Sequence, residues 1–363
     1  MKLKLFENRY QGYVFIYQLL LLAYEINPTI FPKELTLIYL FPLILIERKF
    51  IMQNTKILIL FSALTLISGL LFFIRDYYAN GTLILHFFSL FFIVQCYYHG
   101  HIGTKIHKVL IIIYCLFVFI QLARGIDANF ILTNRSRNMV SLYLMIFVMF
   151  YYIEDYRRNG KIKLWPGLVS MLISLLMIGR GGIIASGLLL FSVSSLKYYF
   201  ENKIKRLKLI VGSLLLVVAL MIFFGSYFIE FMGHSLERFN KMGTVSTQRA
   251  FIFHEYMRLL TFDFKNFMFG FPLDDYVFKL FDLNLHNSYL SLHYFLGGFG
   301  LIVIFLIFKC LFTRGMLLYR CLLLVLLVRG VSDQIFFFSF NDVIIFYLIF
   351  LILKPRPLSV VYK

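Results

Sequence analysis

Charged residues are scarce in this chain of 363 residues: Asp, Glu, Lys and Arg make up 15% of the sequence, whereas hydrophobic residues make up 61%. The surface of a soluble globular protein requires a larger charged fraction. The composition therefore excludes a soluble globular protein and predicts an integral membrane protein. Apolar runs recur along nearly the whole length, so we expect a single transmembrane domain over residues 1–363 without a separate soluble domain.

Metal-binding and nucleotide-binding motifs are also missing. The sequence contains no Walker-type phosphate loop, no HExxH motif and no Asp-x-Asp motif that would hold a metal-bound nucleotide sugar. The four cysteines lie in or beside apolar runs, at spacings that fit neither a zinc site nor a disulfide framework: Cys96, Cys115, Cys310 and Cys321. These absences favour a reaction that needs neither a metal nor a cofactor and that acts on a substrate already activated.

The apolar runs predict an all-α polytopic membrane protein with about twelve transmembrane helices. Their approximate ranges are 11–28, 34–47, 57–74, 82–99, 108–123, 139–153, 164–178, 182–198, 208–229, 288–308, 315–330 and 338–353. The second run is short, and the last has Asp333 and Asp342 near its outer end. Eleven and thirteen spans are therefore alternatives.

Basic residues outnumber acidic residues by 36 to 18, which gives a formal net charge of +18. They concentrate in alternate connections between the expected spans, as the positive-inside rule describes for cytoplasmic loops. We interpret the charge as a topology signal and not as a nucleic-acid-binding surface. Both termini are expected in the cytoplasm, and the first apolar run is expected to be retained because no small-residue cleavage site follows it.

One connection is much longer than the others and is expected on the outer, periplasmic face, where it spans residues 230–287. A loop of this length usually carries function. Its segment STQRAFIFHEYMRLL places Arg249, Phe253 and Tyr256 at helical spacing, which predicts an amphipathic helix on the membrane surface. Gly270 is expected to end the helical part and to turn the chain back toward the bilayer.

Arg180 stands among glycines in the sequence IGRGGIIASG, between the seventh and eighth expected spans. Gly179, Gly181 and Gly182 would allow a tight turn and a close approach of the backbone to a ligand. The next helix would begin there, with free N–H groups and the positive end of its dipole. An arginine at such a point fits the binding of a diphosphate. The alternative is an interfacial arginine that reaches lipid phosphates.

Two further outer residues are candidates for chemistry. Arg249 either supplies a second cation to a diphosphate or faces solvent and headgroups. His286 stands just outside the tenth expected span, which either Asn287 or Ser288 is suited to cap. A neutral imidazole with a pKa of about 6.5 can take a proton from a hydroxyl group near neutral pH. The alternative is that His286 only ends the loop. His293, deeper in the span, is interpreted as a packing or hydrogen-bonding residue.

The motifs GRGG, FGFP, HNSYL and GGFG occur in this order, with Arg249 between the first and the second. With them the chain resembles the O-antigen polymerase and ligase family of bacterial integral membrane glycosyltransferases, which share a multi-helix core and a large periplasmic loop. The resemblance covers most of the chain in topology and implies that Arg180 and Arg249 hold a diphosphate and that His286 activates an acceptor hydroxyl. The chain lacks the family's common serine before Arg180 and tryptophan after Arg249.

The resemblance implies transfer of a saccharide from undecaprenyl diphosphate, in the bacterial inner membrane, to an acceptor sugar on the periplasmic face. We expect a polymerase that joins a growing glycan to a lipid-linked repeat unit. The alternatives are a ligase that moves the finished glycan to lipid A core, and a flippase or transporter of the lipid-linked unit. The expected partners are the lipid-linked donor and acceptor and membrane lipids, with a chain-length regulator protein as a further candidate. The sugars, the linkage and the oligomeric state stay open.

Overall fold

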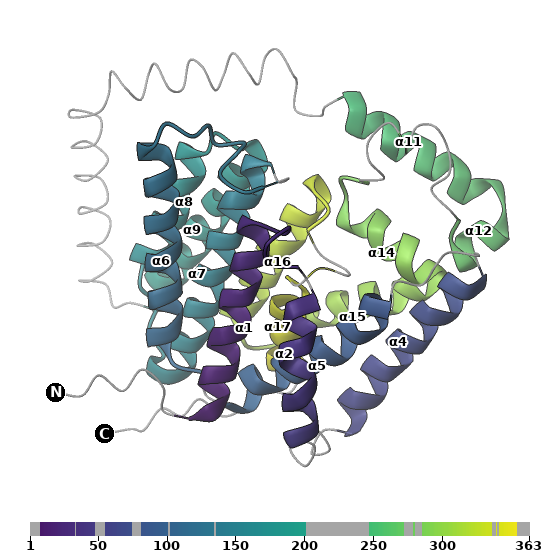
Figure 1. Ribbon diagram of the computed structural model, residues 1–363, viewed down its shortest axis with the longest axis horizontal. Helices are drawn as coiled ribbons and strands as arrows, with labels where there is room; N and C mark the ends of the chain where they lie inside the picture. Colours follow the sequence, from purple (N-terminus) through teal and green to yellow (C-terminus); the bar gives the residue numbers. More distant parts are fainter. Residues whose placement is uncertain are drawn as a thin grey trace.

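The computed structural model describes residues 8–32, 34–47, 55–74, 81–100, 102–133, 136–200, 247–271, 279, 285–335, 339 and 341–353. Within these residues every regular element is a helix, which confirms the expected all-α class. The helices, shown in Figure 1, are α1 (Arg9–Ile26), α2 (Glu34–Ile46), α4 (Thr55–Ile74), α5 (Gly81–Gly100), α6 (Thr104–Ala123), α7 (Arg137–Asn159), α8 (Trp165–Leu176), α9 (Arg180–Phe200), α11 (Thr247–Phe262), α12 (Phe264–Phe269), α14 (Ser288–Leu296), the 3-10 helix η1 (Gly297–Phe299), α15 (Gly300–Phe312), α16 (Leu317–Ser332) and α17 (Asp342–Leu353).

In the described part of the chain, four helical stretches are long and apolar enough to cross a membrane: Thr104–Ala123, Arg137–Asn159, Arg180–Tyr199 and Ser288–Phe312. Other apolar helices, such as Trp165–Leu176 and Asp342–Leu353, are shorter. The ninth expected span, 208–229, lies outside the described residues, and every other expected span overlaps a helix. The apolar runs therefore predicted where helices form.

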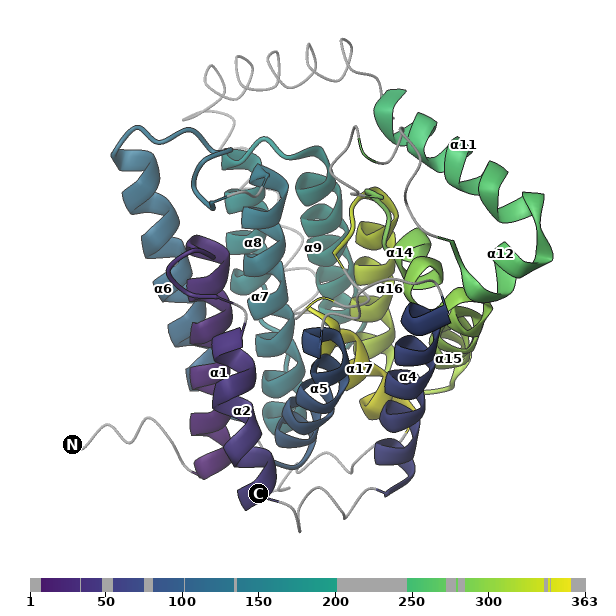
Figure 2. The same cartoon turned by 45° about the vertical axis from the view of Figure 1, so that its right-hand side comes forward.

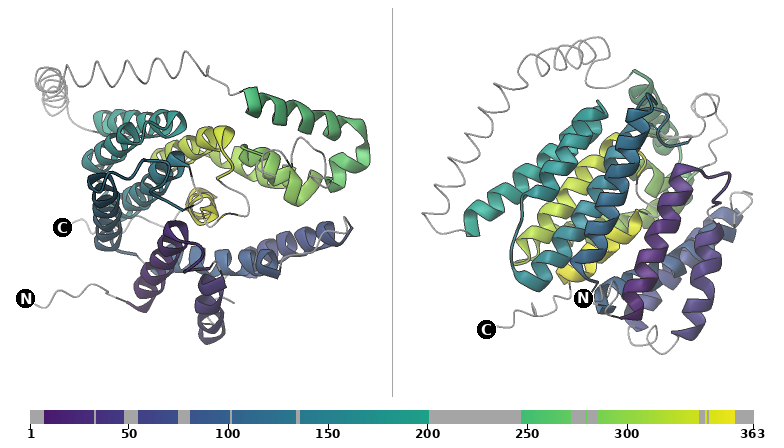
Figure 3. Two further views of the ribbon diagram at one scale, coloured as in Figure 1. Left: turned by 45° about the horizontal axis from the view of Figure 1, so that its top comes forward. Right: turned by 60° about the vertical axis from the view of Figure 1, so that its left-hand side comes forward.

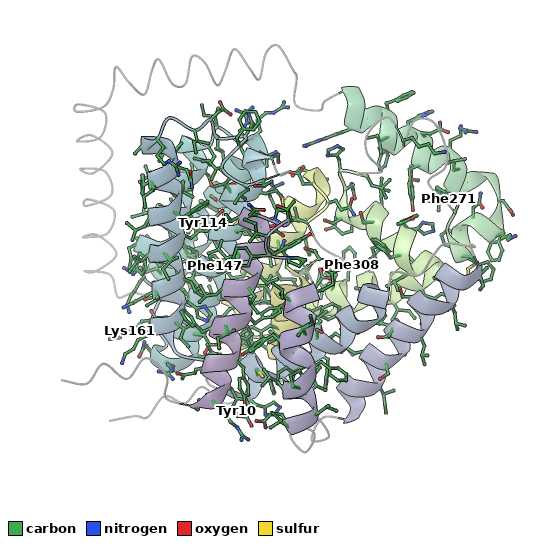
Figure 4. The ribbon with its side chains drawn as sticks, viewed as in Figure 1. Tyr10, Tyr114, Phe147, Lys161, Phe271 and Phe308 are labelled. Atoms are coloured by element: carbon green, nitrogen blue, oxygen red, sulfur yellow. The ribbon has the colours of Figure 1, made fainter. Side chains whose placement is uncertain are left out.

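The interior of the bundle is built around α7, whose side chains are mostly buried. It packs against α6, α8 and α9, and α9 packs in turn against α16; Figure 2 shows these helices side by side. The interior is rich in aromatic rings. Tyr114 and Phe147, both labelled in Figure 4, have ring centroids 5.9 Å apart, and the Tyr114 hydroxyl donates to the Val140 carbonyl at 2.9 Å.

A buried ion pair on α7 joins this helix to α5 and α17. Nη1 of Arg157 donates to the Tyr97 carbonyl at 3.3 Å, and Nη2 donates to the Tyr98 carbonyl at 3.3 Å. These carbonyls lie in the last turn of α5, where no intrahelical donor is left for them. Arg157 also pairs with Glu154 at 3.1 Å, and the Tyr347 hydroxyl of α17 donates to the same carboxylate. The arginine therefore caps α5 and is neutralised inside the bundle.

The helices α11 and α12 curve around α14, as Figure 1 and the left panel of Figure 3 show. The helix expected in this part of the long connection is confirmed as α11. Asp263 caps α12 by accepting from the amide of Lys265, and Gly270, at φ 72°, ends it as expected. Pro272 of the FGFP motif lies outside the described residues.

The tenth expected span, 288–308, is interrupted. Gly297 has a φ of 55°, in the left-handed region that favours glycine, and the chain passes through η1 before the helix resumes as α15. A Cβ on Gly297 would lie 2.2 Å from the backbone oxygen of Met268 in α12. The interruption therefore gives α12 a place to pack against the span.

Candidate functional site

Arg180 is the first residue of α9, and the turn before it is strained. Ile178 has a φ of 51°, which is unusual for a β-branched side chain. Strained residues of this kind are concentrated at functional sites. The side chain of Arg180 is half-buried at the end of the bundle where α9 begins, which we call the Arg180 end.

The glycines around Arg180 bring other helices close. A Cβ on Gly179 would lie 2.4 Å from Oδ1 of Asn138, and one on Gly182 would lie 2.1 Å from Oγ of Ser141. Both neighbours belong to α7. A Cβ on Gly181 would lie 2.8 Å from Nη1 of Arg329 in α16. In the structure the space beside all three glycines is thus occupied by side chains of α7 and α16.

Arg249 meets a carboxylate at the same end. Its Nη2 lies 3.0 Å from Oδ1 of Asp333, which directly follows α16. The other oxygen, Oδ2, lies 2.5 Å from Nη1 of Arg329. Arg329 also donates to the Ser332 hydroxyl at 2.8 Å and to the Asn138 carbonyl at 3.3 Å. One carboxylate therefore joins two guanidinium groups from different helices.

The two arginines differ in exposure. The side chain of Arg329 is 0% exposed, whereas that of Arg249 is 34% exposed and that of Asp333 is 12% exposed. Arg329 is thus a structural partner inside the bundle, because its guanidinium is shielded from any ligand. The side chain of Arg249 stays partly accessible, so Arg249 is the member of this trio that an external anion can reach.

His286 lies beside this trio and is half-buried. Its φ of 49° also falls in the left-handed region. Burial lowers the pKa of His286 below its usual value of 6.5, the charge of Arg249 lowers it further, and the charge of Asp333 acts in the opposite direction. The net effect favours the neutral imidazole, which is the form that can accept a proton from a hydroxyl group.

Asn287 caps α14 as expected: its side-chain oxygen accepts from the amides of Tyr289 at 2.8 Å and Leu290 at 3.2 Å. The side-chain nitrogen of Asn287 donates to the Val331 carbonyl at 3.2 Å, and this bond joins the start of α14 to the end of α16. Ser288 donates to the Asp333 carbonyl at 2.9 Å and strengthens the same junction. His286 is therefore held close to Arg249 and Asp333 by the capping residues that follow it.

The residues of the site thus come from five segments: α9, α11, the start of α14, the end of α16 and the start of α7. Arg329 and Asp333 were missed as site residues by the sequence analysis. A signal was present, because Arg329 is an ionisable residue within an apolar run and Asp333 follows four residues later. In the sequence analysis Asp333 bore only on the number of spans.

A protein metal centre commonly needs at least three ligating side chains close together. Within the described ranges no group of three or more His, Cys, Asp or Glu side chains does so. The pairing of Asp333 with two arginines already uses both of its oxygens. The chemistry that these residues offer is anion binding by Arg249 and proton transfer by His286.

Comparison with protein families, with curated proteins and with solved structures finds no match for this chain. The function must therefore be argued from the residues of the site and their geometry.

Proposed function

We propose that this protein is a membrane glycosyltransferase that polymerises a bacterial surface polysaccharide. It would transfer a growing glycan from undecaprenyl diphosphate to an acceptor sugar hydroxyl of a lipid-linked repeat unit. The observation that carries the proposal is the placement of His286, with a lowered pKa, beside the partly exposed side chain of Arg249. A base and a fixed cation at one end of a helix bundle are what this transfer requires.

In the proposed reaction the acceptor oxygen attacks the anomeric carbon of the donor sugar. The new glycosidic C–O bond forms as the bond from that carbon to the diphosphate oxygen breaks, and the electron pair leaves with the diphosphate. His286 takes the hydroxyl proton. Arg180 and Arg249 bind the departing diphosphate, and the loss of either is expected to remove about 2.7 to 4 kcal/mol of transition-state stabilisation, as for a lost oxyanion donor.

Asp333 would set the position of Arg249 before the donor binds. Its Oδ1 lies 3.0 Å from the guanidinium, so Arg249 is already oriented and little reorganisation accompanies the reaction. The diphosphate carries more negative charge than one carboxylate that is shared between two arginines. It therefore competes well for the exposed side of Arg249.

The proposal includes a topology of twelve spans, with both termini in the cytoplasm and the Arg180 end at the periplasmic face of the inner membrane. The alternation of basic connections supports this orientation. The long connection 230–287, which contains α11 and α12, would then be periplasmic. Lipid-linked saccharides at the outer leaflet would reach Arg180, Arg249 and His286 from that side.

An exposed apolar stripe on α16 supports a lipid-linked substrate. Leu317, Leu324, Val328 and Val331 are exposed, and their spacing places them along one side of the helix. The stripe ends two residues before Asp333. A polyprenyl tail that lies along α16 would place its diphosphate close to Asp333 and Arg249.

The test is a gel of surface and lipid-linked glycans from the native host. A deletion strain would be rescued by the wild-type protein, by His286→Ala or by His254→Ala, all at equal expression; His254 is an exposed histidine of α11 and serves as the matched control. We expect a ladder with the wild type and with His254→Ala, and a single-repeat band with His286→Ala. Long chains that accumulate on the lipid carrier in the deletion strain would instead identify the ligase. An unchanged ladder with His286→Ala would contradict the proposed base.

Polar and ionisable side chains inside the bundle are the observation that bears on the second candidate, a transporter. A cavity of about 20 Å³, enough for one water molecule, lies between α1, α7 and α17 and is lined in part by Gln18, Glu25 and Asn341. Transporters use polar and ionisable residues inside the bundle in this way. A transporter would tolerate the loss of His286 but not that of Glu25, whereas the transferase requires His286.

A further inference from the structure

His293 lies on α14 and binds the α11–α12 arm, which we define as Thr247–Phe269. Its Nε2 is 2.8 Å from the carbonyl oxygen of Phe267 in α12, and its Nδ1 is 2.8 Å from the hydroxyl of Tyr256 in α11. Both ring nitrogens of a single histidine therefore contact the arm, one on each of its two helices. This arrangement confirms His293 as a hydrogen-bonding residue and shows what it binds.

The proton positions follow from the partners. A carbonyl oxygen can only accept, so Nε2 carries a proton and donates to Phe267. In the neutral ring Nδ1 is then an acceptor for the Tyr256 hydroxyl. Tyr256 is fully buried, and its oxygen also lies 3.2 Å from the Leu290 carbonyl of α14. The hydroxyl has a single proton, so it donates to one of these two α14 acceptors at a time, and either bond ties the tyrosine to α14.

Apolar packing reinforces these bonds. Ile252, Tyr256 and Phe271 pack with Leu290 and Tyr294 in a small core that is separate from the main core of the bundle. The ring of Phe271, labelled in Figure 4, has its centroid 4.8 Å from that of Tyr256. The backbone of α12 sits against Gly297, where a Cβ would lie 2.2 Å from the Met268 oxygen.

The arm carries Arg249 at its other end. Arg249 and Tyr256 are seven residues apart, which places them on the same face of α11, about 10 Å from each other along the helix axis. Asn266 donates from its side chain to the Leu259 carbonyl at 3.1 Å and fixes the corner between α11 and α12. A displacement of the arm at His293 would therefore move Arg249 relative to Asp333.

We infer that His293 is a positioning residue: together with Tyr256 it seats the α11–α12 arm on α14 and thereby sets the place of Arg249 beside Asp333 and His286. The attachment of the arm to α14 is a property of the fold, whereas its effect on turnover rests on the proposed function. His293 does not touch the reacting atoms in this account. It acts through Arg249.

The first experiment measures how firmly the arm is held on α14, and it needs no substrate. The full-length protein in detergent would be treated with trypsin, and peptides that end at Arg258 or Lys265, two exposed sites on the arm, would be quantified by mass spectrometry. His293→Phe keeps a ring but removes both hydrogen bonds, and we expect about a tenfold faster release of these peptides, equivalent to about 1.4 kcal/mol. His254→Phe is the matched control and is expected to behave as the wild type. Equal release rates for His293→Phe and the wild type would overturn the claim that His293 holds the arm on α14.

The second experiment tests the link to Arg249 with a double-mutant cycle on glycan polymerisation. We expect His293→Phe to lower the rate about tenfold in the wild-type background but less than twofold in an Arg249→Lys background. A lysine at position 249 already lacks the planar guanidinium whose orientation the arm would set. His293→Gln retains a donor for Phe267 and should restore part of the rate. The same fold-loss in both backgrounds would overturn the positioning role. If the wild type polymerises nothing, the proposed function fails, but the trypsin result still decides whether His293 holds the arm on α14.

Discussion

Asp333 binds two arginines in very different surroundings, and this difference predicts unequal effects of two matched substitutions. In Arg329→Met the buried partner is lost, and in Arg249→Met the partly exposed partner is lost. Both changes replace an arginine by an unbranched apolar side chain. Both leave Asp333 with one remaining arginine.

The magnitudes follow from burial. The side chain of Arg329 is 0% exposed and donates to Asp333, Ser332 and the Asn138 carbonyl, so its removal takes a buried charged donor away from three acceptors at once. Breaking a buried pair in this way destabilises a protein by about 3 to 5 kcal/mol. The side chain of Arg249 is 34% exposed, and a pair of this kind contributes about 0 to 1 kcal/mol.

Unfolding of the purified protein in detergent would measure the difference. The chain has a single tryptophan, Trp165 at the start of α8, whose ring centroid lies 5.2 Å from that of Tyr151, so its fluorescence reports on the bundle. We expect Arg329→Met to lower the free energy of unfolding by several times as much as Arg249→Met. Equal losses, or a larger loss for Arg249→Met, would refute the assignment of Arg329 as the structural partner and Arg249 as the accessible one.

Three further predictions concern Arg157, Gly297 and His286. Arg157→Met should destabilise the protein by about 3 to 5 kcal/mol, measured by the same unfolding assay, because it leaves Glu154 as a buried unpaired charge; the double variant with Glu154→Gln should recover part of this loss. Gly297→Ala should lower the amount of folded protein recovered in detergent, because its Cβ would lie 2.2 Å from a backbone oxygen at a φ of 55°. The rate of the wild type should fall on the acid side only below pH 6.5, because activity is lost as pH falls through the lowered pKa of His286. Arg249→Gln should move this loss of rate to higher pH, because it removes a charge that lowers the pKa of His286. A loss of rate that begins above pH 6.5 in the wild type would contradict a neutral base.

Local patterns predicted much of the fold. Apolar runs placed the helices because hydropathy and length are properties of contiguous residues, and helical spacing in STQRAFIFHEYMRLL predicted α11. The cap at Asn287 was also predictable, because capping depends on one side chain and the two or three amides that follow it.

Features that depend on distant segments could not be predicted in the same way. The glycine pattern around Arg180 suggested room for a ligand, but the structure places Asn138, Ser141 and Arg329 there, from helices about 40 residues before and 150 residues after it in the chain. The bond between Arg249 and Asp333 joins residues that are 84 positions apart. No periodicity within one helix encodes such a contact.

The central claim is that His286 and the arginines form a transferase site that releases undecaprenyl diphosphate. The most direct measurement uses purified protein with lipid-linked saccharides extracted from the native host, in the presence of EDTA, and counts both the undecaprenyl diphosphate released and the glycosidic bonds formed. The account predicts equal numbers for the wild type, and a rate that falls by about 10²- to 10⁴-fold in His286→Ala. Absence of release by the wild type, or equal release by His286→Ala, would contradict it.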